Sequence, residues 1–298
     1  MEGFMARAVA ITAVAPAAWG STYWVTAHLL PPDRPLSAAV VRALPAGLAL
    51  LALRRRLPRG VWWWRSAVLG LLTIGFFFPL VFIAGEHLPS GLAATMTATS
   101  PLVVMGLAWA AVREPAGTVR VTAAVAGLLG VALLVLRSPG GVDPVGVVAA
   151  AGAVLTSGVG FVLVKYWPAP ADDPIDPVTM VSWQLLWGGL ALLPFAALVE
   201  GTPPQLDVPA IAGFVYLGSV GTAVAYVCWF YGLARMTAGA VALIGLLNPV
   251  VGTLLGVALA GELFGPLQAF GMLLVLGGVA AGQLVRQPRR AESGHASP

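Results

Sequence analysis

The segment LNPVVGTLLGVALAGE, residues 247–262, decides the fold because a related segment occurs earlier in the chain. TSPLVVMGLAWAAVRE, residues 99–114, aligns with it at an offset of 148 residues, so that the proline and the closing glutamate coincide. Without a gap the alignment runs from residue 69 to residue 136, with 16 identities in 68 positions. Shared apolar composition raises such a score, but paired proline and glutamate at one spacing are harder to obtain by chance. The chain is therefore predicted to contain an internal repeat.

The composition indicates a membrane protein. Hydrophobic residues make up 59% of the 298 residues, charged residues 9%, and the mean hydropathy is +0.90. A soluble domain is about 25% charged, so this chain could not cover its surface in water. The predicted partner is therefore a lipid bilayer, and the fold class is an all-α polytopic membrane protein, because spans of this type are helical.

Ten apolar segments are each long enough to cross a hydrocarbon core as a helix. They are Ala8–Leu30, Leu36–Leu53, Ala67–Ala84, Gly91–Val112, Val119–Leu136, Val145–Val164, Val178–Val199, Val208–Leu233, Ala238–Ala260 and Pro266–Val285. Connections between them are short and rich in proline and glycine. The first segment is read as a retained span and not as a cleaved signal peptide, because it is long and many similar segments follow it.

The basic residues predict the orientation. With the N-terminus in the cytoplasm, thirteen Lys and Arg residues fall on the inside and only Arg34 and Arg137 fall outside, while Arg42 lies within the second span. This positive-inside bias predicts a multi-pass protein of the plasma or inner membrane with both termini cytoplasmic. Clustering in short loops is not the pattern of a nucleic-acid-binding face, so no nucleic acid is expected as a partner.

Two units of five helices follow from the repeat. Residues 1–138 form the first unit and residues 142–285 the second, and residues 286–298 are predicted to be a disordered cytoplasmic tail. Because five is odd, the second unit lies upside down relative to the first. Inverted repeats around a central cavity are typical of secondary transporters.

The sequence combines ten spans, two five-helix halves, WGSTY at residues 19–23 and the paired proline and glutamate of spans four and nine. These features resemble the EamA-type branch of the drug/metabolite transporter superfamily. The resemblance covers roughly residues 8–285 and implies a helical basket around a central cavity. It also implies cytoplasmic termini and a role in exporting amino acids, metabolites or drugs.

The predicted function is a secondary transporter that exports a small organic solute, an amino acid or a drug-like amphipathic molecule, by alternating access. A membrane-embedded enzyme acting on a lipid-like substrate and a passive pore are the alternatives. The enzyme would need paired intramembrane carboxylates or histidines, which the predicted spans lack. No catalytic residue, cofactor or metal is predicted, and association into a homodimer is left open.

Arg42 is the one ionisable residue well inside a predicted span. A central Arg costs about 2.5–3.5 kcal/mol on insertion scales, so its presence requires a reason. Either Arg42 pairs with a substrate carboxylate in the cavity, or it extends to the outer surface or binds carbonyls freed by Pro45. Aligning the second and seventh spans places Trp183 opposite Arg42, so no second cation is expected.

Aromatic side chains recur at helical spacing in both units, at i,i+4 or i,i+3, and hydroxyl and amide groups lie near them. Such stripes serve either as packing or as the wall of a cavity for an amphipathic solute. The candidate cavity residues are Trp19, Ser21, Tyr23, Arg42, Phe78, Thr95, Thr99, Trp183, Gln184, Tyr226, Trp229 and Asn248.

Three prolines are predicted to bend spans. Pro79, Pro101 and Pro249 each remove a helix hydrogen bond, and a bend midway along a span lets one half of it swing. Glu114 and Glu262 are expected at span ends, where they either stabilise a turn, form a contact between the two halves, or act as coupling-proton sites.

One motif has the spacing of a metal site but lacks the helix and the second acidic cluster that such a site needs. DDPID, residues 172–176, has the spacing of an Asp-Asp-x-x-Asp metal motif. Pro174 and Pro177 forbid a regular helix there and no second acidic cluster exists, so a solvated loop is expected instead. The single cysteine, Cys228, excludes a disulfide within the chain.

Overall fold

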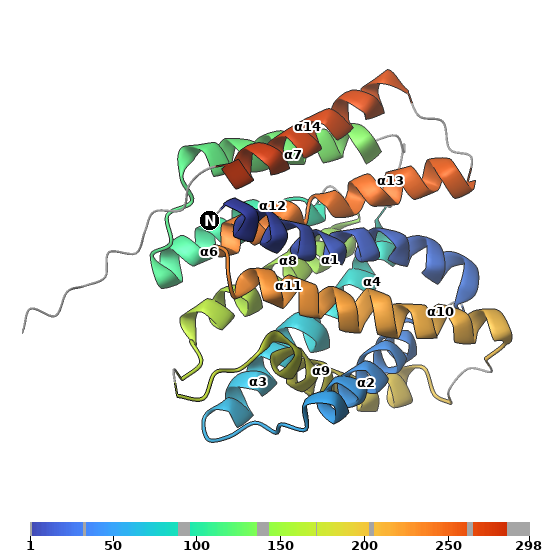
Figure 1. Cartoon of the computed structure of the whole chain (residues 1–298). Coiled ribbons are helices and arrows are strands. Elements are labelled where there is room, and N and C mark those ends of the chain that lie inside the picture. The colour runs from blue at the N-terminus through green and yellow to red at the C-terminus, as the bar shows by residue number, and fades with distance from the viewer. Residues whose placement is uncertain are drawn as a thin grey trace, which may run out of the picture.

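The structure is a computed structural model that describes residues 2–31, 34–88, 96–135, 143–170, 172–202, 206–260 and 265–284, and in these ranges the regular elements are all helices (Figure 1). The first predicted unit contains α1 (Glu2–Leu29), α2 (Pro35–Arg54), α3 (Trp62–Gly70), η1 (Leu71–Phe76), α4 (Phe77–His87), α6 (Ser100–Val112) and α7 (Thr118–Val135). The second contains α8 (Pro144–Tyr166), α9 (Pro177–Val199), α10 (Val208–Gly218), η2 (Ser219–Val224), α11 (Ala225–Leu233), α12 (Ala238–Ile244), α13 (Leu247–Ala260) and α14 (Pro266–Leu284).

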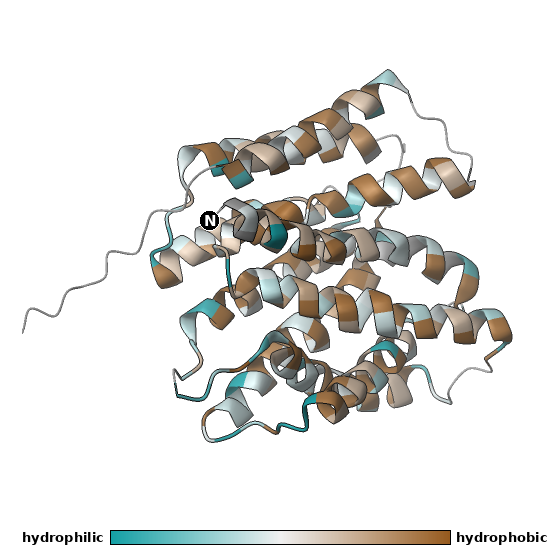
Figure 2. Ribbon diagram, viewed as in Figure 1, coloured by the Kyte–Doolittle hydropathy of each residue, from teal (hydrophilic) through white to brown (hydrophobic). Residues whose placement is uncertain are grey.

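Seven helical stretches of the described residues are long and apolar enough to cross a membrane, by length and composition. The prediction was ten. Two more apolar helices, Ser100–Val112 and Thr118–Leu134, are shorter, and α1 is not among the seven. The fourth predicted span began at residue 91, and residues 91–95 lie outside the described ones. Large apolar side chains are exposed on the outer helices, among them Val125 and Leu129 of α7 and Leu273 and Leu276 of α14, and this is the surface that lipid requires. Figure 2 colours many residues of both helices as hydrophobic.

Aspartates start three helices of the second unit. Asp143, Asp176 and Asp207 precede α8, α9 and α10, and each side chain accepts hydrogen bonds from backbone N–H groups of the first turn. Each of these helices also has a proline at its first or second position, where the missing N–H costs nothing. The acidic residues of these loops are therefore used to begin helices.

Two long helices are interrupted by a π-helical segment at matching positions. Leu71–Phe76 separates α3 from α4, and Ser219–Val224 separates α10 from α11, 148 residues later. A π segment widens one turn and weakens the regular hydrogen-bond ladder, and such segments often occur at functional sites. The same offset of 148 that aligned the sequence thus also relates these two segments.

Helix packing follows a reciprocal pattern. In one direction, α1 packs on α11 and α13, and its counterpart α8 packs on α4 and α6. In the same way, α3 packs on α9, and its counterpart α10 packs on α2. Helices α2 and α9 pack on each other, as do α7 and α14, which Figure 1 shows side by side at one end of the molecule.

Small residues allow the close approach of α7 and α14. A Cβ added to Gly130 would lie 2.6 Å from the carbonyl oxygen of Gly271, and one added to Gly278 would lie 2.7 Å from that of Ala123. At the offset of 148, Gly278 corresponds to Gly130 and Gly271 corresponds to Ala123. The two close approaches are therefore related by the same offset as the repeat, and they depend on residues without large side chains.

Connecting loops are tied together in pairs. Arg54 and Arg56, at the end of α2, pair with Asp176 and Asp173 before α9. At the other end of the same two helices, the Glu200 carboxylate accepts hydrogen bonds from the backbone N–H groups of Leu36 at 2.6 Å and Ser37 at 2.8 Å. A carboxylate there satisfies first-turn donors of α2 and complements its dipole.

A third loop pair joins a histidine to an aspartate. His87 Nδ1 lies 2.7 Å from Asp143 Oδ2, and this hydrogen bond holds the pKa of the Asp143 carboxyl below its ordinary value of 3.8. A carboxyl whose pKa is lowered in the folded state contributes stability above the unfolded pKa, and loses it as the pH falls through the folded value.

Asp143→Asn keeps a capping side chain but removes the charge. We expect it to lower the thermal unfolding midpoint in detergent at pH 6, with a difference from wild type that shrinks once the pH falls below 3.8. A difference that is constant across this range would contradict the assignment.

Candidate functional site

Six of the predicted cavity residues lie in one connected cluster, called the central cluster below. It is built from α1, α2 and α4 of the first unit and from α9 and α11 of the second. Its members are Trp19, Arg42, Phe78, Gln184, Tyr226 and Trp229, together with the η1 and η2 residues that they contact.

Arg42 is the charged member of the central cluster, and its side chain is only 7% exposed. Its Nε donates to Thr222 Oγ1 at 2.9 Å and its Nη2 donates to the Gly221 carbonyl oxygen at 3.2 Å, both in η2. The guanidinium carbon lies 4.7 Å from the centre of the Phe78 ring, within cation–π range. Among the ion pairs of the described residues, none involves Arg42.

Trp19 joins the first unit to the second. Its Nε1 donates to the Gly221 carbonyl oxygen at 3.1 Å, the same oxygen that Arg42 binds. The indole ring lies 5.5 Å from the Tyr226 ring and 5.2 Å from the Trp229 ring, centre to centre. Aromatic faces and edges at these separations form an apolar wall beside the guanidinium.

Gln184 lies on the other side of the central cluster. Its Oε1 accepts a hydrogen bond from Thr73 Oγ1 at 2.9 Å, and Tyr226 donates to the Thr73 carbonyl oxygen at 3.3 Å. Thr73 belongs to η1, so each unit sends one polar side chain to the π segment of the other: Arg42 to η2 and Gln184 to η1.

This reciprocity corrects the alignment of Arg42. The matching stretches AGLALLAL, residues 46–53, and GGLALLPF, residues 188–195, are 142 residues apart. The same offset places Gln184 opposite Arg42, so the prediction of Trp183 at this position was wrong by one residue. A cation in the first unit is therefore matched by a neutral amide in the second.

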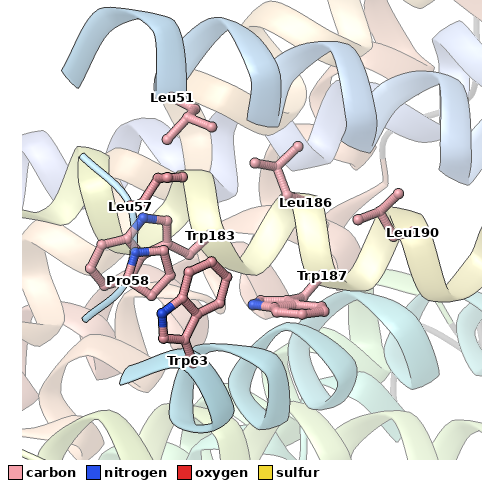
Figure 3. Close-up of a pocket in the computed structure, with 8 residues that line it drawn as sticks. All are labelled: Leu51, Leu57, Pro58, Trp63, Trp183, Leu186, Trp187 and Leu190. Atoms are coloured by element: carbon pink, nitrogen blue, oxygen red, sulfur yellow. The ribbon is translucent and has the colours of Figure 1, made fainter. Parts of the chain in front are cut away.

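Trp183 lies away from the central cluster. Its Nε1 donates to the Arg56 carbonyl oxygen at 2.7 Å, in the loop after α2. Trp183, Trp63 and Trp187 line a groove of about 160 Å³ between α2, α3 and α9, which Figure 3 shows together with leucines of α2 and α9. Neighbouring residues on a helix point about 100° apart, so Gln184 can enter the central cluster while Trp183 faces this loop.

Other predicted residues take local roles. Ser21 Oγ lies 2.7 Å from Tyr216 Oη, and Thr99 Oγ1 donates to the Met96 carbonyl oxygen in its own turn. Asn248 lies at the start of α13, where its carbonyl oxygen faces Gly20 of α1. Thr95, Glu262 and residues 286–298 lie outside the described residues, as does the side chain of Tyr23.

The three prolines lie near the starts of helices. Pro79 is the third residue of α4, directly after η1, and Pro101 is the second residue of α6. Pro249 is the third residue of α13, which a two-residue turn separates from α12. A proline ring clashes with the carbonyl four residues earlier, here Gly245, which explains a break at this turn. Glu114, after α6, accepts a hydrogen bond from the backbone of Gly239 at 3.4 Å.

Sequence reasoning missed four residues that contact or border the central cluster: Thr22, Thr73, Gly221 and Thr222. Thr73 and Gly221 are aligned at the offset of 148, in the middle of η1 and η2, so the repeat itself could have directed attention to them. The acids of the DDPID motif do not converge on a common centre. Asp173 pairs with Arg56, and Asp176 caps α9 and contacts Arg54.

Comparison with known proteins identifies the family. The model of the EamA-like transporter family matches residues 6–136 and again residues 144–281. The protein PecM of Dickeya dadantii is 41% identical over 81% of this chain and 80% of its own length. The transporter YwfM of Bacillus subtilis is 29% identical over 94% and 95%, and the inner membrane transporter YedA of Escherichia coli is 28% identical over 82% and 80%.

A solved crystal structure has the same fold, with a TM-score of 0.76 at 21% identity, covering 93% of this chain and 96% of that one. Together with the apolar helices, the matches identify a multi-pass integral membrane transporter and not an enzyme. The chain belongs to the EamA-like transporter family.

Proposed function

We propose that this transporter is a secondary carrier that exports small organic solutes by alternating access between two inverted five-helix halves. The central cluster, which both halves build, is the proposed solute site. The observation that carries the proposal is the reciprocal contact of Arg42 with η2 and of Gln184 with η1. Two similar halves that hold each other at equivalent places can exchange their roles, which is the basis of alternating access.

The repeat has independent support. The family model matches the chain twice, and the boundary between the matches, residues 137–143, contains the predicted junction of the halves. The matched π segments and the reciprocal helix packing agree with the same division. Two close crossings of α7 and α14, at Gly130 and Gly278, are expected if a two-fold axis relates the halves.

The interrupted helices provide places for movement. The η1 and η2 segments lie within long helical stretches, and the turn between α12 and α13 divides another. Broken helices near a solute site are common in secondary transporters, because their free backbone groups and weakened ladders permit rearrangement. Export is proposed as the direction because it is the role that resemblance to EamA-type transporters implies.

The loop contacts agree with the alternation of spans in the proposed orientation. Arg54 and Arg56 pair with the loop before α9, and the positive-inside pattern places both loops in the cytoplasm. His87 pairs with Asp143, and the same pattern places both residues outside. Each of these contacts joins loops that the alternation of the predicted spans assigns to one side, and the positive-inside pattern alone decides which side is cytoplasmic.

Single-cysteine labelling tests this orientation. In a Cys228→Ser background, which removes the one native cysteine, Thr202→Cys is expected to react with a membrane-impermeant maleimide in intact cells. Asp172→Cys is expected to react only after permeabilisation, because its loop is assigned to the cytoplasm. Both residues are exposed, so accessibility within the protein is matched. Labelling of Asp172→Cys in intact cells would overturn the orientation.

Counterflow in proteoliposomes tests the carrier. Vesicles loaded with one unlabelled amino acid, organic acid or cationic drug are expected to accumulate the labelled form transiently, with a saturable initial rate. A pore would give flux that rises linearly with concentration and no transient accumulation. Uniform absence of saturable flux across a broad panel of solutes would refute the carrier proposal.

A further inference from the structure

We infer that the central cluster binds the carboxylate of an organic acid with a planar apolar body, in preference to amines and zwitterions. The inference rests on the carrier function proposed above and specifies the class of its solute. The carboxylate is assigned to Arg42 and the apolar body to the surrounding aromatic rings.

The first argument is the unbalanced charge of Arg42. A guanidinium has five N–H donors, of which the structure uses two, on Thr222 and Gly221, leaving three. The side chain is 7% exposed, and no ion pair of the described residues includes it. A buried charge is costly unless a counter-charge and hydrogen bonds accompany it, and a bound carboxylate would provide both.

The second argument is a surplus of hydrogen-bond donors. Within the described residues, Trp229 Nε1 is buried and lacks an acceptor, although the residue is only 3% exposed. The buried Thr22 hydroxyl also lacks a partner in the same part of the chain. A ligand that satisfies these groups must bring acceptors, as a carboxylate and a carbonyl or hydroxyl oxygen do.

The third argument is the position of Thr22 relative to Arg42. A Cβ built on Gly221 would lie 3.8 Å from Thr22 Oγ1 and 4.0 Å from Arg42 Nη2. The hydroxyl and the guanidinium therefore both lie near the same glycine, beside the Leu217 side chain, whose Cδ2 is 3.4 Å from that point. A hydroxyl and a guanidinium that converge in this way can bind the two oxygens of one carboxylate.

The fourth argument concerns the rest of the ligand. Trp19, Tyr226 and Trp229 form a connected set of rings, and Phe78 lies against the guanidinium. No Asp or Glu side chain hydrogen-bonds to any residue of this region in the described chain, so an ammonium group would meet the positive charge of Arg42 without a carboxylate partner. The site therefore disfavours cations and zwitterions.

Four probes that share one phenyl ring separate these classes: phenylacetate, phenylacetamide, phenylalanine and phenethylammonium. We expect phenylacetate to bind detergent-purified protein at least about tenfold more tightly than each of the others, by competition against radiolabelled phenylacetate. The same order is expected for counterflow rates in proteoliposomes.

Arg42→Gln replaces the guanidinium with a neutral amide, the group that Gln184 has at the equivalent position of the second half. This variant is expected to lose the preference for phenylacetate over phenylacetamide. Arg59→Gln removes one exposed positive charge from the loop after α2 and is the matched control, expected to keep the preference. If Arg42→Gln does not yield folded protein, Thr22→Val keeps Arg42 and is expected to weaken phenylacetate binding several-fold without weakening phenylacetamide.

The outcomes separate this inference from the carrier proposal. Saturable counterflow that ignores charge, or that favours phenethylammonium or phenylalanine, overturns the carboxylate site and leaves the carrier intact. Absence of phenylacetate binding also overturns the site, whichever solutes are transported. Flux of all four probes that rises without saturation refutes the carrier itself.

Discussion

Gly271→Val is expected to lower the free energy of unfolding in detergent by about 3 kcal/mol, because the α7–α14 crossing has no room for a side chain. A Cβ at Gly271 would lie 2.6 Å from the carbonyl oxygen of Gly130 and 3.1 Å from the backbone nitrogen of Leu134. Both are backbone atoms, which cannot rotate out of the way as a side chain can, so the two helices must move apart. Thermal or denaturant-induced unfolding of the purified protein measures the loss.

Gly277→Val on the same helix is the matched control. A Cβ at Gly277 meets nothing within 4 Å, so valine there faces the surroundings and is expected to change stability little. Gly278→Val, one residue further, is expected to be nearly as harmful as Gly271→Val, because its Cβ would lie 2.7 Å from the Ala123 carbonyl oxygen. Equal stability of the Gly277 and Gly278 variants would contradict the close crossing.

The repeat shows how far sequence reasoning reaches in this fold. The offset of 148, read from a few prolines, glycines and glutamates, also relates the bounds of η1 and η2, which were not used to find it. It could not predict that these segments are π-helical, because a widened turn follows from packing and has no residue signature of its own. Nor could it predict the break before Pro249, which the sequence placed at the proline itself.

For the candidate site, spacing located the aromatic residues but not their partners. Trp19, Phe78, Tyr226 and Trp229 lie together in the structure, as residues on facing helical stripes can. Trp183 does not, because its helix position points about 100° away from that of Gln184, toward the loop after α2. The backbone carbonyl of Gly221 carries two of the contacts, and a glycine carbonyl has no side-chain pattern by which sequence could identify it.

The reciprocal contacts of the two halves differ in charge, and this difference predicts unequal costs for two matched substitutions. Thr73→Val removes the hydroxyl that lies 2.9 Å from the neutral amide of Gln184 and 2.7 Å from the Leu69 carbonyl oxygen of its own helical stretch, and a loss of about 1 kcal/mol is expected. Thr222→Val removes the acceptor of Arg42 Nε, which leaves part of a buried charge without a hydrogen bond, and a loss of about 2–3 kcal/mol is expected. Thr253→Val is the control, since that hydroxyl binds only the Pro249 carbonyl of its own helix.

A double-mutant cycle identifies the cause of the larger loss. On an Arg42→Met background no charged group needs the Thr222 hydroxyl, so Thr222→Val is expected to cost little there. Thr73→Val should cost the same on both backgrounds, because the Thr73 hydroxyl binds Gln184 and not Arg42. Unfolding of the four variants and the two parents in detergent gives both interaction energies. If Thr222→Val costs as much without Arg42 as with it, the hydroxyl stabilises η2 itself, and the contact between the halves contributes nothing at this position.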